Sequence, residues 1–338
     1  TQNGRDLVDA LQTGELQFTG PFAPMCEQFV AERREAGRDY SQQEKILRMF
    51  DNFSKDYAVE PFVVSEELAQ AWSQKRPNET DINRYNRVME MQRFSKYLVE
   101  QGYPSFLTGI RLSKHYTHTP YIFTEDEIRR IFQIADSLET CASVPLRHQV
   151  MPVLLRVLYG CGLRISEALE LRVANVDLSN GLLHIRHGKN GRERLVPMSE
   201  SLTQRCQIYT QNVLDGKEPD AFFFCSRLNQ PYSRSGVGKS FRGLLWDAGI
   251  PYLGKERGPS IHDLRHTFVC HRLNQWASNE VDLTAMLPIL SKYLGHTSIS
   301  ATSWYLRLTA EAYPGIVHKM DCFTKGVFPV SWEENDIE

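Results

Sequence analysis

The chain contains 338 residues, of which 41% are hydrophobic and 24% are charged; these ordinary globular proportions leave room for two domains. No run approaches 18 apolar residues, and the N-terminus lacks a basic segment followed by an apolar one. We therefore expect neither a membrane-spanning helix nor a secretory signal. The net charge of −2 excludes binding to a polyanion through overall charge, so any such binding must come from local basic faces.

Seven cysteines are scattered through the chain, and no two of them form a C-x-x-C pair. The odd number and the spacing argue against a disulfide framework and against a zinc site, so we expect no bound metal. Cys161 lies in an apolar run and is predicted to be a small core residue.

Residues 17–103 show only helical patterns and follow an N-terminal extension, residues 1–16. Ser41 and Glu44 have the spacing of a capping box, and Thr80 is placed to cap a long helix that ends near Val99. A helical unit this small suggests a binding module rather than a catalytic one. The predicted helices cover about 22–37, 41–50, 65–72 and 80–99.

Four basic residues of the last of these helices lie near one face or its edge: Arg84, Arg87, Arg93 and Lys96. A solvated charged face is the commoner explanation of such a pattern. Contact with the phosphates of a nucleic acid is the alternative.

Residues 104–122 are predicted to be a linker, because Pro104, Gly109 and Pro120 interrupt any regular pattern. A second domain is expected over residues 123–322, followed by an acidic tail, residues 323–338. Thr124 and Glu127 form a capping-box pattern, and residues 182–187 and 193–198 flank a hairpin signal, Asn190-Gly191. Ser260 is placed to cap a helix. We also predict a buried helix over 150–159, a strand at 222–224, and helices from 203 and over 236–248, 262–277, 283–293 and 309–320.

Arg164 follows two glycines, Gly160 and Gly162, which let the backbone bring a guanidinium close to a ligand. The guanidinium fork matches two phosphate oxygens, so phosphate recognition is one interpretation. A structural ion pair with Glu167 or Glu170 is an equally good one.

Other residues of the second half suggest the same chemistry. Lys189 stands at a hairpin tip, where it could reach into a cleft or simply face solvent. His262 and Arg265 are three residues apart on a helix and could clamp a phosphate, whereas His266 could be structural. His296 and Tyr305 follow; a single tyrosine at helical spacing is usually part of a core. Together the set could hold a phosphodiester, attack it and protonate the leaving oxygen without a metal.

These residues, in this order, resemble the catalytic set of the tyrosine recombinases, the lambda-integrase and Xer-like superfamily. The resemblance covers about residues 20–320. It implies a mainly α fold with a small antiparallel β-sheet: a helical, SAM-like core-binding domain and an α+β catalytic domain. It also implies that Tyr305 is the nucleophile, with the catalytic residues Arg164, Lys189, His262, Arg265 and His296.

The resemblance implies a site-specific recombinase that cuts and rejoins double-stranded DNA at core sites through a 3′-phosphotyrosine intermediate. No cofactor is implied. The expected assembly is a tetramer on two duplexes, with possible accessory proteins, in the nucleoid of a bacterial cytoplasm. We expect an integrase of a mobile genetic element; a type IB-like topoisomerase and a non-catalytic DNA-binding protein of the same fold are the alternatives. The basic face of residues 84–96 becomes the predicted DNA contact of the first domain.

Overall fold

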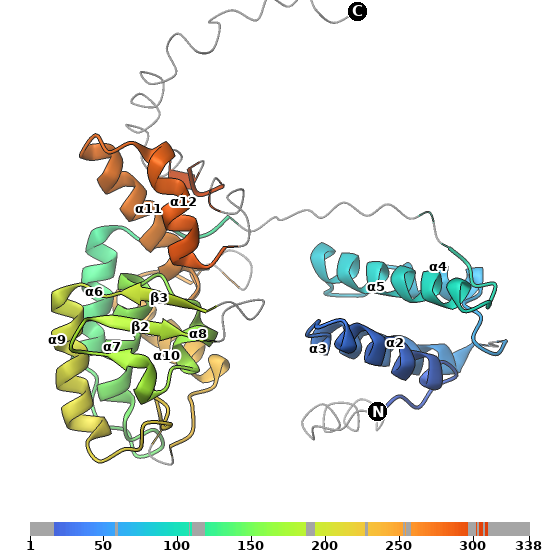
Figure 1. Cartoon of the computed structure of the whole chain (residues 1–338), viewed down its shortest axis with the longest axis horizontal. Helices are drawn as coiled ribbons and strands as arrows, with labels where there is room; N and C mark the ends of the chain where they lie inside the picture. Colours follow the sequence, from blue (N-terminus) through green and yellow to red (C-terminus); the bar gives the residue numbers. More distant parts are fainter. Residues whose placement is uncertain are drawn as a thin grey trace, which may run out of the picture. The chain divides into compact units, whose positions relative to one another are not determined.

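The computed structural model divides the chain into two compact units, Thr1–Thr117 and His118–Glu338, and the division falls inside the segment 104–122 (Figure 1). The structure describes residues 17–57, 60–107, 109, 119–186, 193–226, 229–252, 254, 258–296, 302, 304–306, 308 and 309.

The first unit is a bundle of helices around an aromatic core. Phe29 and Phe94 lie 5.6 Å apart between ring centroids, and Phe50 lies 5.2 Å from Trp72, all of them buried. Edge-to-face ring packing of this kind adds to the burial of apolar area. The helices are α2 (Ala23–Glu35), α3 (Ser41–Phe53), the 3-10 turn η1 (Ser54–Asp56), α4 (Glu66–Ser73) and α5 (Asp81–Glu100).

Of the two caps predicted in this unit, Thr80 is confirmed and Ser41 is not. The Ser65 and Thr80 side chains accept hydrogen bonds from Leu68 N and Asn83 N, at the starts of α4 and α5. The capping box predicted at Ser41 is wrong, because Ser41 is already helical and its hydroxyl donates to Asp39.

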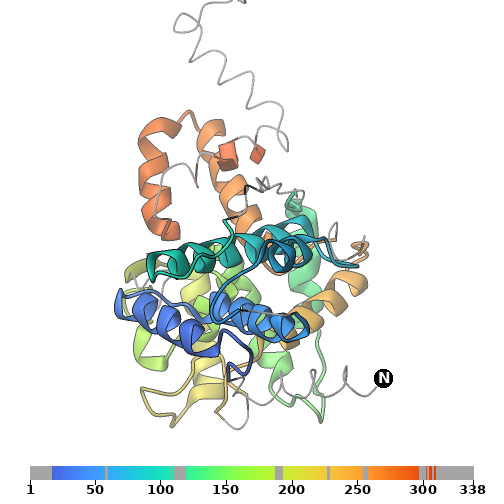
Figure 2. The ribbon, with the colours of Figure 1, turned by 90° about the vertical axis from the view of Figure 1, so that its right-hand side faces the viewer.

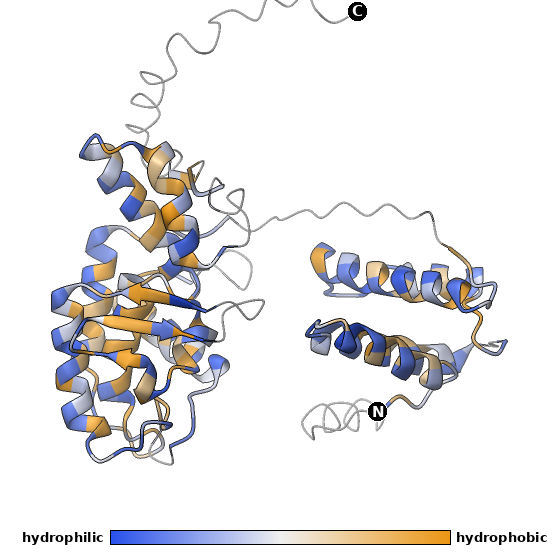
Figure 3. Cartoon of the chain, in the orientation of Figure 1, coloured by the Kyte–Doolittle hydropathy of each residue, from blue (hydrophilic) through white to orange (hydrophobic). Residues whose placement is uncertain are grey.

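In its described part, the second unit combines seven α-helices and two short helical turns with a three-stranded antiparallel sheet in the order β1-β2-β3. Leu183 pairs with Val176 on one side and Val196 on the other, and Figure 3 shows β2 as mostly hydrophobic. The elements are α6 (Glu125–Asp136), α7 (Arg147–Gly160), α8 (Ile165–Leu169), η2 (Val173–Asn175), β1 (Val176–Asp177), β2 (Leu182–Ile185), β3 (Arg194–Pro197), α9 (Glu200–Tyr209), a π-helical turn η3 (Thr210–Leu214), α10 (Arg234–Asp247), α11 (Asp263–Ser278) and α12 (Leu283–Leu294).

Helix α7 is the centre of this unit and packs against α6, α9 and α11. Val150, Leu154 and Leu158 on it are buried, which confirms the prediction of a helix that is apolar almost all round. Cys161 at its end is buried too, as predicted. Figures 1 and 2 show α11 and α12 as a pair at one end of the unit.

Two local predictions for this unit have opposite outcomes. The capping box of Thr124 and Glu127 is confirmed at the start of α6. The strand at 222–224 is wrong: Phe222 makes only an isolated bridge with Arg172, whose guanidinium lies 3.6 Å from the Phe222 ring centroid.

The start of α11 also differs from the prediction, because His262 rather than Ser260 is the N-cap residue. Ser260 instead donates its backbone N–H and its hydroxyl to Asp263. The predicted helix over 309–320 lies outside the described residues except for Thr309, which is helical. Among the described helices, none has both the length and the apolar character needed to cross a bilayer.

Candidate active site

Arg164 is placed by a glycine turn between α7 and α8. Gly162 has a φ of +59°, and a Cβ there would lie 2.5 Å from Cδ1 of Phe268, so both backbone and packing require glycine. Arg164 then occupies the N-cap position of α8, with its side chain 20% exposed. The turn at Gly162 therefore leads directly into Arg164, which donates to Glu167. The approach of its guanidinium to a ligand stays a prediction.

Glu167 is the buried anion that organises the arginines. Its carboxylate accepts hydrogen bonds from Arg164 Nη1 at 2.8 Å and from Arg194 Nη2 at 2.9 Å, and it lies 4.0 Å from Arg265 Nη1. Burial alone would raise the pKa of Glu167. Hydrogen bonds and positive charge from Arg194, followed by Arg164, outweigh burial and lower that pKa to about 2. Arg164 thus pairs with Glu167 while part of its side chain stays exposed to a ligand.

Arg265 is fixed by main-chain acceptors from two distant segments. It is 2% exposed, and it donates to Gly162 O at 2.7 Å and to Leu294 O at 2.8 Å. Burial, followed by the charge of Arg164, lowers the pKa of Arg265 to about 10, so it remains a cation at neutral pH.

His296 follows directly after the left-handed Gly295 that ends α12. Its Nε2 lies 3.0 Å from Arg265 Nη2, and its Nδ1 lies 2.8 Å from the Thr302 hydroxyl. Since a guanidinium only donates, Nε2 accepts and the proton of the neutral ring is assigned to Nδ1. Burial and then the charge of Arg265 lower the pKa of His296 to about 4, which agrees with a neutral ring.

Tyr305 lies within this cluster and is only 4% exposed. Its ring stacks on His296 with centroids 6.2 Å apart, and its hydroxyl lies 2.9 Å from His266 Nδ1. Burial raises the pKa of the Tyr305 phenol, and Arg265 opposes that rise. The phenol is therefore protonated at neutral pH and needs a proton acceptor before it can act as a nucleophile.

The histidine beside the Tyr305 hydroxyl is His266, which the sequence suggested could be structural. His262 is exposed at the start of α11, and its ring centroid lies 4.7 Å from that of His266. The spacing of four residues already placed the two rings on one helix face. Nothing in the sequence showed which of them would meet a tyrosine 39 residues later.

Lys189 lies outside the described residues, so its side chain is not placed. The structure does describe the strands on either side of Lys189. Ile185 of β2 pairs with Arg194 of β3, as expected for a hairpin. Arg194 is the residue of this hairpin that sequence reasoning missed. Besides contacting Glu167, it donates from Nε to Tyr293 O at 2.8 Å and so ties β3 to the end of α12.

The basic residues of α5 do not share one environment. Arg87 is 3% exposed, bonds to Glu79 through two nitrogens and donates to the main chain of Trp72 and Gln74. It stabilises the core, and its prediction as a DNA contact is corrected.

The other three basic residues of that helix also have partners within the unit. Arg84 donates to Ser73 O. Arg93 pairs with Glu90 and Lys96 with Glu100, yet both side chains remain largely exposed, 56% and 74%.

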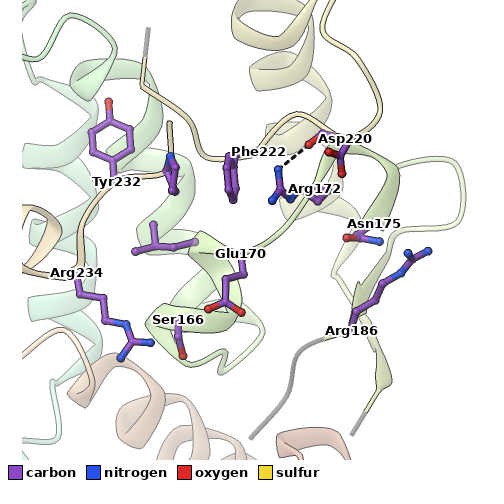
Figure 4. A pocket seen from close by; sticks show the side chains of 11 residues that line it. Ser166, Glu170, Arg172, Asn175, Arg186, Asp220, Phe222, Tyr232 and Arg234 are labelled. Carbon is purple, nitrogen blue, oxygen red and sulfur yellow. Dashed lines mark hydrogen bonds between the residues drawn. The ribbon is translucent and has the colours of Figure 1, made fainter. Parts of the chain in front are cut away.

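A hollow of about 530 Å³ lies beside α8, lined by Ser166 and Glu170 of the segment that follows Arg164 (Figure 4). Three arginines lie around it, Arg172, Arg186 and Arg234. Arg172 donates to Asp220 O, whereas Arg186 and Arg234 are exposed. No group of three or more metal-ligating side chains occurs within the described ranges.

The sequence model of the phage integrase family matches residues 122–312, more than half of the chain and all of the site. The chain belongs to the phage integrase family. This integrase-family protein is 27% identical over 315 residues to a putative integrase/recombinase, y4rB, of Sinorhizobium fredii, covering 89% of this chain and 97% of the relative. It is 27% identical over 223 residues to the tyrosine recombinase XerA of Pyrococcus horikoshii, with 65% and 68% covered.

Two solved structures share the fold of this integrase. One is the Tn1549 transposon integrase in complex with transposon right end DNA, with a TM-score of 0.60 at 16% identity, covering 86% of this chain and 99% of that one. The other is the XerH site-specific recombinase bound to a palindromic difH substrate, with a TM-score of 0.57 at 18% identity, covering 79% and 74%. The predicted fold class is confirmed. The integrase is a site-specific recombinase, an enzyme that breaks and rejoins DNA, and the topoisomerase alternative is not favoured.

Proposed function

We propose that Tyr305 of this recombinase attacks the scissile phosphodiester and forms a 3′-phosphotyrosine bond. The observation that carries the proposal is the convergence of Arg265, His296 and Tyr305 with Arg164, through Glu167, from segments up to 141 residues apart (305 − 164). Two guanidiniums stabilise charge on the non-bridging oxygens of a phosphate as it is attacked. The 3′-phosphotyrosine bond conserves the energy of the broken phosphodiester. The 5′ hydroxyl of a partner strand can therefore attack it and rejoin the DNA without a cofactor.

The remaining members of the predicted set have supporting roles in this proposal. Lys189 protonates the departing 5′ oxygen as general acid. His296 binds a phosphate oxygen; an anion there offsets the positive charges of Arg265, Arg164 and Arg194 that now disfavour its protonation. His262, exposed at the N-terminus of α11, contacts the DNA near the scissile phosphate.

The target duplex is first obtained by selecting binders from a randomised pool with full-length Tyr305→Phe protein. A series of versions of the selected duplex is then synthesised, each with a nick at a different position. Cleavage close to a nick releases a short fragment that diffuses away, so the covalent adduct accumulates. Wild-type protein forms a covalent protein–DNA band on a denaturing gel in excess EDTA. Tyr305→Phe forms none but binds the duplex as tightly, because only one hydroxyl is removed. Adduct formation by the Phe variant would disprove the role of Tyr305, and a requirement for metal would disprove the proposed chemistry.

We propose further that residues 17–103 and 123–322 act as a core-binding and a catalytic domain on one duplex, and that four protomers recombine two duplexes. The exposed cations Arg93 and Lys96 of the first unit, and Arg186 and Arg234 of the second, are the proposed backbone contacts. Mass measurement of the complex on the selected duplex tests the assembly: four chains with two duplexes are expected, and one chain per duplex throughout the reaction would contradict it.

We propose a mobile genetic element as the setting of the reaction, in the nucleoid of a bacterial cytoplasm. The support is the putative integrase/recombinase name of the relative and the fold shared with a transposon integrase. Amplification across a circular junction of the DNA that flanks the gene tests this. A circular form should appear when the wild-type protein is expressed and should be absent with Tyr305→Phe.

A further inference from the structure

The hydrogen bond between His266 and Tyr305 connects α11 directly to the proposed nucleophile. The distance from His266 Nδ1 to the Tyr305 hydroxyl is 2.9 Å, within the range for a proton donor and acceptor in direct contact. The ring planes are tilted by 38°, with centroids 5.5 Å apart. His266 is therefore in position to take the phenolic proton without any rearrangement of the two side chains.

The surroundings fix both partners of this contact. His266 belongs to a helix that is anchored one residue earlier by Arg265, whose guanidinium donates to Gly162 O and Leu294 O. Trp304 lies 5.8 Å from the His266 ring and 5.2 Å from the Tyr305 ring, edge-on to both. A contact held from two helical segments is preorganised, which is what proton transfer in a transition state requires.

The other histidines are less well placed for this step. His296 accepts a hydrogen bond from Arg265 through Nε2 and contacts Thr302 through Nδ1, so both ring nitrogens are engaged away from the phenol. His262 is exposed at the start of α11, and its ring packs edge-on against the His266 ring with centroids 4.7 Å apart. The titratable and charged groups around His266 and its tyrosine are His262, Arg265, Arg164, His296 and Cys270.

We propose that His266 is the general base for Tyr305, a role that rests on the proposed nucleophile. As the Tyr305 oxygen forms its bond to phosphorus, its O–H bond breaks and the proton moves to Nδ1 of neutral His266. The bond from phosphorus to the 5′ oxygen breaks, and that oxygen takes a proton from the general acid, proposed above to be Lys189. Rejoining runs the same transfers backwards: the 5′ hydroxyl gives up its proton, and protonated His266 returns one to the departing phenolate.

The test uses His266→Asn in the full-length protein, on the selected nicked duplex. The amide places a hydrogen-bonding atom near the position of Nδ1 but takes no proton at neutral pH, so it separates positioning from proton transfer. The rate of adduct formation should fall by about 10²-fold or more. DNA affinity and the thermal unfolding midpoint should match wild type. His262→Asn, on the same helix face, is measured in parallel because it removes the neighbouring imidazole; whatever its effect on the rate, it should keep the wild-type dependence on pH.

Two further readouts separate a base from a structural residue. Wild-type cleavage should rise with pH and then level off as an imidazole loses its proton, whereas His266→Asn should continue to rise as hydroxide replaces the base. On a duplex with sulfur in place of the 5′ bridging oxygen, the leaving group no longer needs an acid. Lys189→Ala should therefore recover most of its rate, and His266→Asn should not.

The outcomes distinguish this inference from the proposed nucleophile. If wild type forms the adduct and His266→Asn matches it in rate and in pH profile, the inference fails and the role of Tyr305 stands. If His262→Asn shows the large defect and the lost plateau instead, the base is His262 and the inference fails. If His266→Asn does not fold, wild-type cleavage of the sulfur-containing duplex decides: a rate independent of pH between 5 and 8 overturns the inference, and a rate that rises and levels supports it. If wild type forms no adduct, or Tyr305→Phe forms one, the proposed nucleophile itself is wrong.

Discussion

Glu167 holds the guanidiniums of the site in one place. Because Glu167 is buried, replacing it should lower the free energy of unfolding strongly. Its carboxylate binds Arg164 and Arg194, and without it these cations and Arg265 would face one another unneutralised. Removing one partner from a buried ion pair leaves an uncompensated charge and costs about 3–5 kcal/mol. We expect Glu167→Gln to lower the free energy of unfolding by that amount and to abolish adduct formation. Denaturant unfolding measures the first effect, and Glu170→Gln, an exposed residue at the end of the same helix, should change stability by less than about 0.5 kcal/mol.

The contribution of Glu167 to stability should depend on pH in the acid range. Its pKa falls from 4.5 to about 2 in the folded protein, so the folded state favours the ionised form. This stabilisation is complete above pH 4.5 and is lost as the pH falls towards 2. The difference in unfolding free energy between wild type and Glu167→Gln should therefore shrink over that interval. A difference that stays constant from pH 6 to pH 3 would contradict the assignment.

At the scale of elements, the turn between α7 and α8 positions both Arg164, which follows it, and Arg265, which donates to its carbonyl. Gly162 supplies a left-handed backbone, packs against Phe268 and offers its carbonyl to Arg265. Gly162→Ala adds strain of about 1 kcal/mol from the backbone and a clash that costs about 1–3 kcal/mol more. We expect a large loss of stability and of cleavage.

Gly216→Ala is the matched control for this turn. Gly216 also has a positive φ, +68°, but a Cβ added there would meet nothing within 4 Å, so only the backbone cost applies. Urea unfolding should therefore give a clearly smaller loss for Gly216→Ala than for Gly162→Ala, with cleavage retained. Equal losses would show that packing against Phe268 does not matter.

For the whole molecule, a net charge of −2 makes DNA binding a matter of local faces. Each phosphate contact that is lost should reduce the slope of log affinity against log salt by about 0.9. Arg93→Ala and Arg234→Ala should each do so. Arg234→Ala should leave stability unchanged because its side chain is exposed, whereas Arg93→Ala should also lower it, because Arg93 pairs with the buried Glu90. Filter binding of the selected duplex between about 50 and 200 mM salt measures the slope.

Arg87→Ala is the contrasting variant of the same helix. Arg87 is buried against Glu79 and main-chain carbonyls, so its loss should lower the unfolding free energy by about 3–5 kcal/mol. Its salt slope, measured where the protein is folded, should stay at the wild-type value. A reduced slope for Arg87→Ala would contradict its structural role.

The sequence by itself determined the family-level properties of this protein. The apolar run of residues 150–159 and the caps at Thr80 and Thr124 are local signals that the fold confirms, and the order of the residues from Arg164 to Tyr305 carried the resemblance to the family. Local signals suffice there because a cap or an amphipathic face depends on residues within about one or two turns.

Only the tertiary structure decided which side chains meet. Arg87 lies on the same helix as exposed cations, but it is buried and pairs with Glu79. His266, which was not in the predicted catalytic set, lies 2.9 Å from the Tyr305 hydroxyl. Arg194 joins β3 to Glu167 and to the end of α12, a contact across 99 residues that no spacing rule contains. These outcomes depend on the packing of segments far apart in the chain, where burial and competing partners assign each polar group its neighbour.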